Sequence, residues 1–481
     1  MTVMPLDARA RIGLVAGPVL FIVMLMMAPP AGITENGWRA AAAGILMAVW
    51  WVTEALPIPV TSLLPLVLFP LLGVLTIDAA AAPYANPVIF LFMGGFIIAK
   101  ALERTGLHKR AALATIRVVG TRPRNLVGGF MAATAFISLW VSNTATVAMM
   151  YPMATSVIDL AERDKQNYDP RFAVALLLGL AYSASIGGLG TLIGTPPNAL
   201  LAGFVAETYG REIGFAQWML LGVPVVLVGL PITWFVLVRW LHPLGDREIA
   251  GGQETFGAES AALGPVSRAQ RIVATIAVLT AVCWMTRPLL ASVVPGLSDA
   301  GIGIAGALLL FLVPVDRRSF TPVLRWEDAE RIPWGVLILF GGGLSLAQAL
   351  SDTGLATWIG NSLTMLGTLP LVVMVAAVTA LVLVMTEFTS NTATAAIFLP
   401  ILGSIAVGLG IDPFILLVPA TLAATCAFML PVGTPPNAIV FAGGRLTIPQ
   451  MVKAGALVNL VMLVVINAAV FLLAPWVFGA N

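Results

Sequence analysis

The sequence predicts an all-α membrane protein that crosses the bilayer many times and contains two repeats of opposite orientation. Three observations support this prediction: the composition, the recurrence of apolar stretches and the duplication of two motifs. Of the 481 residues, 59% are hydrophobic and 10% are charged, and the mean hydropathy is +0.98. A soluble domain carries about 25% charged residues, so this composition disfavours a soluble enzyme. The net charge of +2 predicts no nucleic-acid partner.

Apolar stretches close to membrane thickness recur along the whole chain. A helix needs about 20 apolar residues to cross the hydrocarbon core of a bilayer. We expect eleven such spans, at residues 12–29, 38–53, 58–76, 86–103, 173–204, 217–241, 272–294, 301–315, 333–350, 414–442 and 453–477. No small-residue cleavage site follows the first stretch, so we interpret it as a retained span and not as a signal peptide.

Two short polar motifs each occur twice. The motif Ser-Asn-Thr-Ala-Thr begins at Ser142 and again at Ser390, an offset of 248 residues. The motif Gly-Thr-Pro-Pro-Asn-Ala begins at Gly194 and again at Gly433, an offset of 239 residues. Because both motifs recur in the same order at nearly the same spacing, the sequence predicts two structural repeats.

The charges that flank the repeats indicate that the second repeat is inverted. Segment 103–124 carries six lysines and arginines, whereas the equivalent segment 351–372 carries none. Basic loops stay in the cytoplasm, so the same unit faces opposite sides of the membrane, as in many transporters. The basic clusters lie at 9–11, 104–124, 163–171, 247–271 and 317–331. We therefore expect a cytoplasmic N-terminus, a C-terminus outside, and a polar cytoplasmic connector at 242–271.

The remaining apolar segments, 125–158 and 366–411, are predicted to be re-entrant hairpins. Basic residues flank 125–158 on both sides, so the chain must enter and leave the membrane on the cytoplasmic side. Its 34 residues are too few for two crossings, which need about 40 residues and a turn. The first tip then falls at Ser142-Asn143-Thr144. The inverted partner 366–411 dips from outside, with its tip at Ser390-Asn391-Thr392.

Proline pairs are predicted to break the helices 173–204 and 414–442 within the membrane. Proline cannot continue a helix, because it lacks the N–H and clashes with the preceding turn. A break frees carbonyl groups that can bind a cation, and the next half-helix presents N–H groups that can bind an anion. Irregular backbone is tolerated at this depth only where protein or a water-filled cavity surrounds it.

The tips and breaks carry small neutral side chains that are rich in oxygen. Such oxygens can coordinate sodium, and the hydroxyl and amide groups can donate to a carboxylate. Ser138 and Thr386 lie four residues before the two tips and so share the tip-facing side of a helix. We interpret them as cation ligands, with a helix-packing hydroxyl as the alternative. Glu54 and Glu387 are functional candidates as ionisable groups near apolar stretches, although a structural role for Glu54 is equally plausible.

No charged residue occurs in any of the four motif segments. Charges are absent between Arg124 and Asp159, between Arg171 and Glu207, and on both sides of Asp412, from Glu387 to Arg445. An anion bound there would find no lysine or arginine in these segments. Cations bound with it would supply the missing charge and would couple its transport to an ion gradient.

These features resemble the divalent anion–sodium symporters, a family that carries di- and tricarboxylates. The resemblance covers nearly the whole chain and rests on Glu54-Ala55-Leu56-Pro57, the segment from Gly94-Gly95-Phe96 to Gly106-Leu107-His108, both tips and both proline breaks. It implies a homodimer with eleven spans and two re-entrant hairpins in each protomer. It also implies a scaffold domain, here 1–124 and 272–365, and a transport domain, here 125–241 and 366–481, that moves as an elevator.

The resemblance also implies two sodium sites and a substrate site. One sodium site would use Ser138, Ser142, Asn143 and Gly194, and the second would use Thr386, Thr389, Asn391 and Gly433. The substrate carboxylates would contact Ser142, Asn143, Thr144, Thr195, Pro196, Ser390, Asn391, Thr392, Thr434 and Pro435. Co-transported sodium is expected, with no organic cofactor.

We therefore expect a sodium-coupled importer of C4-dicarboxylates such as succinate, malate or fumarate, in the plasma membrane of a bacterium. A dicarboxylate exchanger, or a citrate or sulfate carrier of the same fold, is the alternative. An intramembrane enzyme is disfavoured, since there are two scattered histidines, His108 and His242, and no cluster of acidic residues and histidines within the membrane. A channel is disfavoured because two opposed hairpins suit alternating access to a closed site.

Overall fold

The computed structural model describes residues 8–163, 168–246, 248–249, 252–316, 318–362 and 369–479. Within these ranges the chain is almost entirely helical, apart from a small antiparallel pair of strands, β1 (Pro314–Asp316) and β2 (Thr321–Pro322). Some sequence predictions fall outside these ranges: the basic residues Lys165, Arg247 and Arg317, residues 366–368 of the second predicted hairpin, and both chain ends.

The first half of the chain forms the following helices. They are α1 (Ala8–Met26), α2 (Glu35–Thr53), α3 (Ile58–Thr61), α4 (Leu64–Leu71), α5 (Ile77–Ala81), the 3₁₀-helix η1 (Ala82–Ala85), α6 (Pro87–Thr105), α7 (Leu107–Val119), α8 (Pro123–Ser138), α9 (Asn143–Arg163), α10 (Pro170–Gly188), α11 (Pro196–Tyr209), α12 (Phe215–Phe235) and the π-helix η2 (Val236–Leu241).

The second half repeats much of this order. Its helices are α13 (Gly252–Ala262), α14 (Arg268–Leu290), α15 (Asp299–Leu312), α16 (Trp326–Ala329), α17 (Trp334–Asp352), α18 (Leu355–Ser362), α19 (Leu371–Thr386), α20 (Asn391–Gly408), α21 (Phe414–Ala424), α22 (Pro435–Ala442) and α23 (Ile448–Phe478). The predicted connector 242–271 therefore includes a short helix, α13.

Eight helices within the described ranges are long and apolar enough to cross a membrane. They are Ala8–Met26, Ile77–Thr105, Pro170–Gly188, Phe215–Leu241, Arg268–Leu290, Trp334–Asp352, Asn391–Gly408 and Ile448–Phe478. Several expected spans contain shorter helices. The stretch 58–76 is divided into α3 and α4, each with proline in its first turn, and α15 ends at Leu312, two residues before Pro314. Proline limits these helices because it cannot donate a backbone hydrogen bond.

The duplicated motifs lie at equivalent positions in the two halves. Helices α8 and α9 are joined by residues 139–142, and α19 and α20 by residues 387–390, so each Ser-Asn-Thr motif lies at a tight turn between two helices. Each proline pair begins a new helix, α11 or α22, after an irregular segment that follows α10 or α21. The sequence duplication therefore corresponds to a structural duplication.

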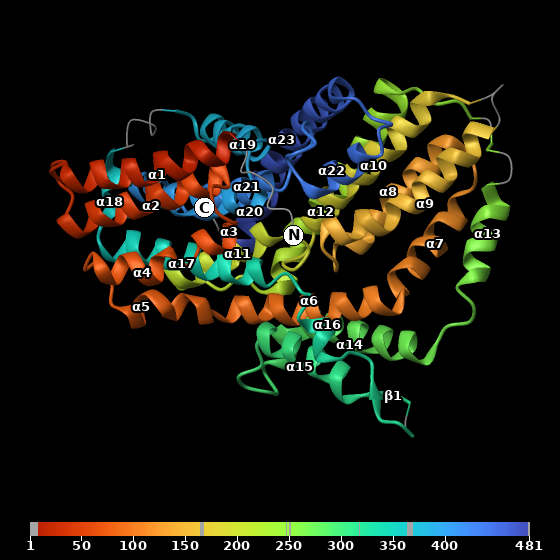
Figure 1. Ribbon diagram of the computed structural model, residues 1–481, viewed down its shortest axis with the longest axis horizontal. Coiled ribbons are helices and arrows are strands. Elements are labelled where there is room, and N and C mark those ends of the chain that lie inside the picture. Colours follow the sequence, from red (N-terminus) through yellow and green to blue (C-terminus); the bar gives the residue numbers. More distant parts are fainter. Residues whose placement is uncertain are drawn as a thin grey trace.

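Long-range packing brings the two halves together. Helices α10 and α21 are buried along nearly their whole length; α10 packs on α8 and α9, and α21 packs on α19 and α20. Helix α11 of the first half packs on α20 and α21 of the second. In Figure 1, α1, α2, α17 and α18 lie together at one end of the molecule, and α7 to α10 lie at the other.

Candidate functional site

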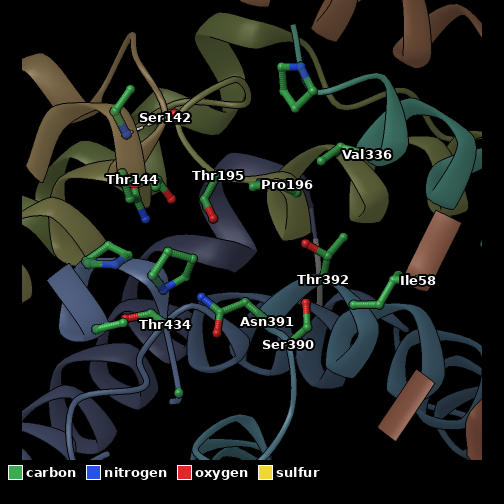
Figure 2. Close-up of a pocket in the computed structure, with 18 of the residues that line it drawn as sticks. Ile58, Ser142, Thr144, Thr195, Pro196, Val336, Ser390, Asn391, Thr392 and Thr434 are labelled. Carbon is green, nitrogen blue, oxygen red and sulfur yellow. Dashed lines mark hydrogen bonds between the residues drawn. The ribbon is translucent and has the colours of Figure 1, made fainter. Parts of the chain in front are cut away.

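The two helix-pair tips and the two proline breaks meet at one cavity of about 990 Å³. Figure 2 shows Ser142 and Thr144 on one side of this cavity and Ser390, Asn391 and Thr434 on another, with Thr195 and Pro196 between them. All ten residues that the sequence assigned to substrate binding line it: Ser142, Asn143, Thr144, Thr195, Pro196, Ser390, Asn391, Thr392, Thr434 and Pro435. Motifs that are far apart in the sequence therefore share one space.

Oxygen atoms converge beside the first tip. The buried Ser138 hydroxyl oxygen, at the end of α8, lies 2.6 Å from Asn143 Oδ1 and 2.8 Å from the Ala184 carbonyl oxygen, so these two acceptors share its single proton. A Cβ placed on Gly194 would lie 2.5 Å from the Gly188 carbonyl oxygen and 3.0 Å from that of Ser138. Only glycine leaves this space open. Hard cations prefer such an all-oxygen environment.

The second tip repeats this arrangement with small differences. The buried Thr386 hydroxyl contacts Asn391 Oδ1 at 2.9 Å and the Ala424 carbonyl at 2.6 Å. The Thr389 hydroxyl contacts the Met385 carbonyl of the preceding helical turn and shares a 2.5 Å hydrogen bond with the Thr394 hydroxyl. Of the two threonines, Thr386 is thus the one whose hydroxyl meets the tip asparagine.

Six of the eight predicted sodium-site residues line the cavity. They are Ser142, Asn143, Gly194, Thr389, Asn391 and Gly433. The other two, Ser138 and Thr386, lie behind the tips, fully buried, and reach the site through Asn143 and Asn391. In both halves the hydroxyl contacts a tip asparagine and a carbonyl of a neighbouring helix, α10 or α21, and its role as a cation ligand stays a prediction.

The asparagine of each Thr-Pro-Pro-Asn motif organises the adjacent break. Asn198 Nδ2 donates to the carbonyls of Gly188, Leu189 and Thr191 at 3.1, 3.3 and 2.8 Å. Asn437 Nδ2 does the same for Ala427 and Leu430 at 3.0 and 2.9 Å. These side chains satisfy carbonyls that a continuous helix would have satisfied. These two asparagines were not among the predicted site residues, although their place in the duplicated motif is a signal that could have identified them.

The helix that follows each break points its N-terminus at the cavity. Thr195 and Thr434 are the N-cap residues of α11 and α22, and both line the cavity. The Thr195 hydroxyl lies 3.4 Å from the Thr425 hydroxyl, so the first break touches the start of the second. Helix N-termini carry a partial positive charge and free N–H groups, which suits bound carboxylates.

Charged residues from outside the four motif segments also line the cavity. They are Arg9, Glu54, Lys100, Glu103 and Arg331. The Arg9 guanidinium donates to the carbonyl of Phe388, two residues before Ser390, at 2.7 Å. The motif segments are uncharged, yet the cavity that they help to form is not. Glu54 was already a functional candidate from the sequence, but no local pattern identifies the other four, because they lie on segments far from the motifs.

A metal cluster of histidine, cysteine and acidic side chains is not found in the described ranges. No group of three or more histidine, cysteine, aspartate or glutamate side chains could hold a metal ion there.

Comparison with known proteins identifies the family. Residues 9–479 match the family described as the sodium:sulfate symporter transmembrane region. The chain is 43% identical to the sodium-dependent dicarboxylate transporter SdcS of Staphylococcus saprophyticus over 481 residues, which cover 98% of this chain and 92% of that protein. The SdcS protein of Staphylococcus aureus is also 43% identical, with 99% and 94% covered. This chain belongs to the sodium:sulfate symporter family.

Two solved structures share the fold of this family member. The MtrF protein of Neisseria gonorrhoeae, described among antimetabolite efflux pumps, has a TM-score of 0.58 at 13% identity and covers 100% of this chain and 96% of its own. The YdaH transporter of Alcanivorax borkumensis has a TM-score of 0.58 at 18% identity, with 85% and 87% covered. The family resemblance inferred from the motifs is confirmed: the chain is an integral membrane transporter and not an enzyme.

Proposed function

We propose that this protein is a sodium-coupled importer of C4-dicarboxylates such as succinate, malate or fumarate. The observation that carries this proposal is the duplicated set of neutral oxygen ligands at one cavity, formed by two tips and two breaks. The relatives named as sodium-dependent dicarboxylate transporters support it. Two bound sodium ions would balance the two negative charges of the substrate.

In this proposal each half binds one sodium ion and one end of the substrate. Ser138, Ser142, Asn143 and Gly194 form the first sodium site, and Thr386, Thr389, Asn391 and Gly433 form the second. The two carboxylates of the substrate are held by the hydroxyls and amides of both tips and by the N-termini of α11 and α22. A C4-dicarboxylate fits a repeated site because its two charged ends are chemically alike.

Transport into liposomes tests this function. Purified protein should accumulate labelled succinate only when sodium is higher outside than inside, and potassium should not replace sodium. Uptake that is independent of sodium, or that requires succinate inside the liposome, would indicate an exchanger. Sulfate and citrate serve as competitors, since stronger competition by either than by malate or fumarate would assign the substrate differently.

We further propose that the protein is a homodimer and that transport follows an elevator motion in each protomer. The basic loops face the cytoplasm, and the helix pairs α8–α9 and α19–α20 are re-entrant hairpins. Gly95 of α6 belongs to the proposed scaffold domain, and Ile193 of the first break belongs to the proposed transport domain, so this pair lies at the boundary between the two. A Cβ on Gly95 would lie 3.1 Å from Ile193 Cγ2.

A reversible cross-link tests the proposed motion. The pair Gly95→Cys and Ile193→Cys would be introduced in a background with Cys283→Ser and Cys426→Ala. Oxidation should stop uptake and reduction should restore it, with each single-cysteine variant as a control. Full uptake by the cross-linked protein would contradict an elevator motion at this boundary.

A further inference from the structure

We propose that Glu387 is a positioning residue that makes the second cation site different from, and tighter than, the first. This inference rests on the proposed sodium-coupled function. It concerns a buried carboxylate that fixes the second break and places a negative charge beside one of the two sites.

Glu387 binds the irregular segment that follows α21. One carboxylate oxygen, Oε1, accepts from the backbone N–H groups of Phe428 and Met429 at 2.8 and 2.9 Å and from Asn459 Nδ2 at 2.8 Å. The other, Oε2, accepts from the N–H groups of Met429 and Leu430 at 2.9 and 3.1 Å. Every partner is a donor, so this arrangement satisfies the ionised carboxylate.

This carboxylate is buried and forms no ion pair among the described residues. The Glu387 side chain is 2% exposed, and none of the ion pairs among the described residues includes it. A buried charge is costly unless other groups compensate it. Backbone N–H groups supply part of this compensation, and a nearby bound cation would supply the rest.

The position of Glu387 places its charge at the second site. It directly follows Thr386, whose hydroxyl contacts Asn391 Oδ1. A Cβ placed on Gly433 would lie 3.2 Å from Glu387 Oε2 and 3.3 Å from the Glu387 carbonyl oxygen. The carboxylate therefore lies against Gly433, a residue of the proposed second sodium site that lines the cavity.

In the first half, a neutral hydroxyl group links the break to the end of the hairpin helix. The residue equivalent to Glu387, at the offset of 248, is Leu139. Leu139 has no carboxylate, and the Thr191 hydroxyl makes the link: it donates to the Leu139 carbonyl at 2.5 Å and accepts from the Gly194 N–H at 3.0 Å. Thr191 is equivalent to Leu430, at the offset of 239. Both breaks are thus tied to the end of the preceding hairpin helix, one by a hydroxyl and the other by a carboxylate.

This difference predicts unequal sodium affinities. A negative charge a few ångströms from a cation, in a medium where solvent screening is weak, favours binding strongly. The second site should therefore fill at lower sodium concentration than the first. Removing the charge should weaken sodium binding while leaving the groups that contact the substrate in place.

Sodium titration of matched variants tests the inference. Glu387→Gln keeps the size of the side chain but removes its charge, and Thr191→Val is the matched variant in the first half. Succinate uptake into liposomes is measured against external sodium, together with the KM for succinate at saturating sodium. For Glu387→Gln we expect the half-saturating sodium concentration to rise about tenfold, with the rate largely recovered at high sodium. Thr191→Val should cause a smaller rise.

A binding measurement that needs no transport completes the test. Sodium alone should raise the unfolding temperature of the wild-type protein in detergent, and Glu387→Gln should lose the part of this response seen at low sodium. If Glu387→Gln does not fold, Asn459→Ala removes one donor and keeps the charge. The bound cation must then supply more of the compensation, so half-saturating sodium should fall about twofold to threefold.

The outcomes separate this inference from the proposed function. Wild-type half-saturating sodium in Glu387→Gln, or in Asn459→Ala where the former does not fold, would overturn the role of Glu387. A lower rate at every sodium concentration, with unchanged half-saturation, would indicate a purely structural role and would also overturn it. Absence of sodium-stimulated succinate uptake by the wild-type protein would instead overturn the proposed function.

Discussion

The two halves of the cavity contain equivalent hydrogen bonds at their tips, but different chemical groups hold their breaks. Ser138 in the first half and Thr386 in the second each join a tip asparagine to a carbonyl of the adjacent helix. The breaks differ, however, because Thr191 ties the first to its hairpin and Glu387 ties the second. The geometry around the tips is therefore alike in the two halves, while the groups that tie the breaks differ in charge.

Replacing the tip asparagines should have the largest effect and would test whether the halves are equally necessary. Asn143→Ala and Asn391→Ala each remove an amide oxygen that contacts a buried hydroxyl. Since this oxygen is a proposed sodium ligand, we expect each variant to lower sodium-dependent succinate uptake by about 100-fold. Wild-type uptake by either variant would remove that half from the proposed site. Thermal unfolding of the purified variants is the control for folding.

Adding a methyl group at the break glycines, Gly194 and Gly433, should affect uptake differently in the two halves. In Gly194→Ala the new Cβ would lie 2.5 Å from a backbone oxygen of Gly188, which cannot move without shifting the break. In Gly433→Ala the nearest atom is the Ala427 Cβ at 3.1 Å, so a small adjustment suffices. We expect Gly194→Ala to lose most of its uptake and Gly433→Ala to retain a measurable fraction. Equal uptake by the two variants would contradict this difference in packing.

Removing the buried hydroxyls should weaken sodium binding by an intermediate amount. Ser138→Ala and Thr386→Val leave an asparagine oxygen and a buried carbonyl without their donor, a loss of about 1–3 kcal/mol. We expect half-saturating sodium in uptake assays to rise about tenfold in each variant. Thr386→Ser keeps the hydroxyl and should restore the wild-type value. If half-saturating sodium is raised in Thr386→Ser as well, the methyl group of Thr386, and not its hydroxyl, determines sodium binding.

The smallest effect is expected at Arg9, whose guanidinium contacts the carbonyl of Val52 as well as that of Phe388 beside the second tip. Its guanidinium donates to the Phe388 carbonyl, and its charge lies at the cavity wall, where it attracts anions. For Arg9→Gln we expect the KM for succinate to rise about twofold to threefold, and added salt should reduce the difference. Arg171→Gln, which removes a cation paired with Asp169, is the matched control. An equal change in both variants would indicate a general effect of charge.

Much of the site could be predicted from the sequence because it lies in two duplicated motifs. The ten proposed substrate residues line one cavity, and the duplicated motifs together with the family resemblance predicted them. Of the charged wall residues, Glu54 was a functional candidate from the sequence, whereas Arg9, Lys100, Glu103 and Arg331 were not. They lie on segments far from the motifs, and no local spacing indicates which cavity a distant segment will reach.

The sequence by itself determined the helical membrane fold, the two repeats and the neutral chemistry of the motifs, because apolar length, charge asymmetry and proline act locally. Tertiary structure alone decided which charges reach the cavity. It also revealed the partners of Glu387. That side chain was a functional candidate from its place in an apolar stretch, yet its hydrogen bonds are to residues at least 41 positions away. Contacts over such distances depend on how whole helices pack, which no single segment encodes.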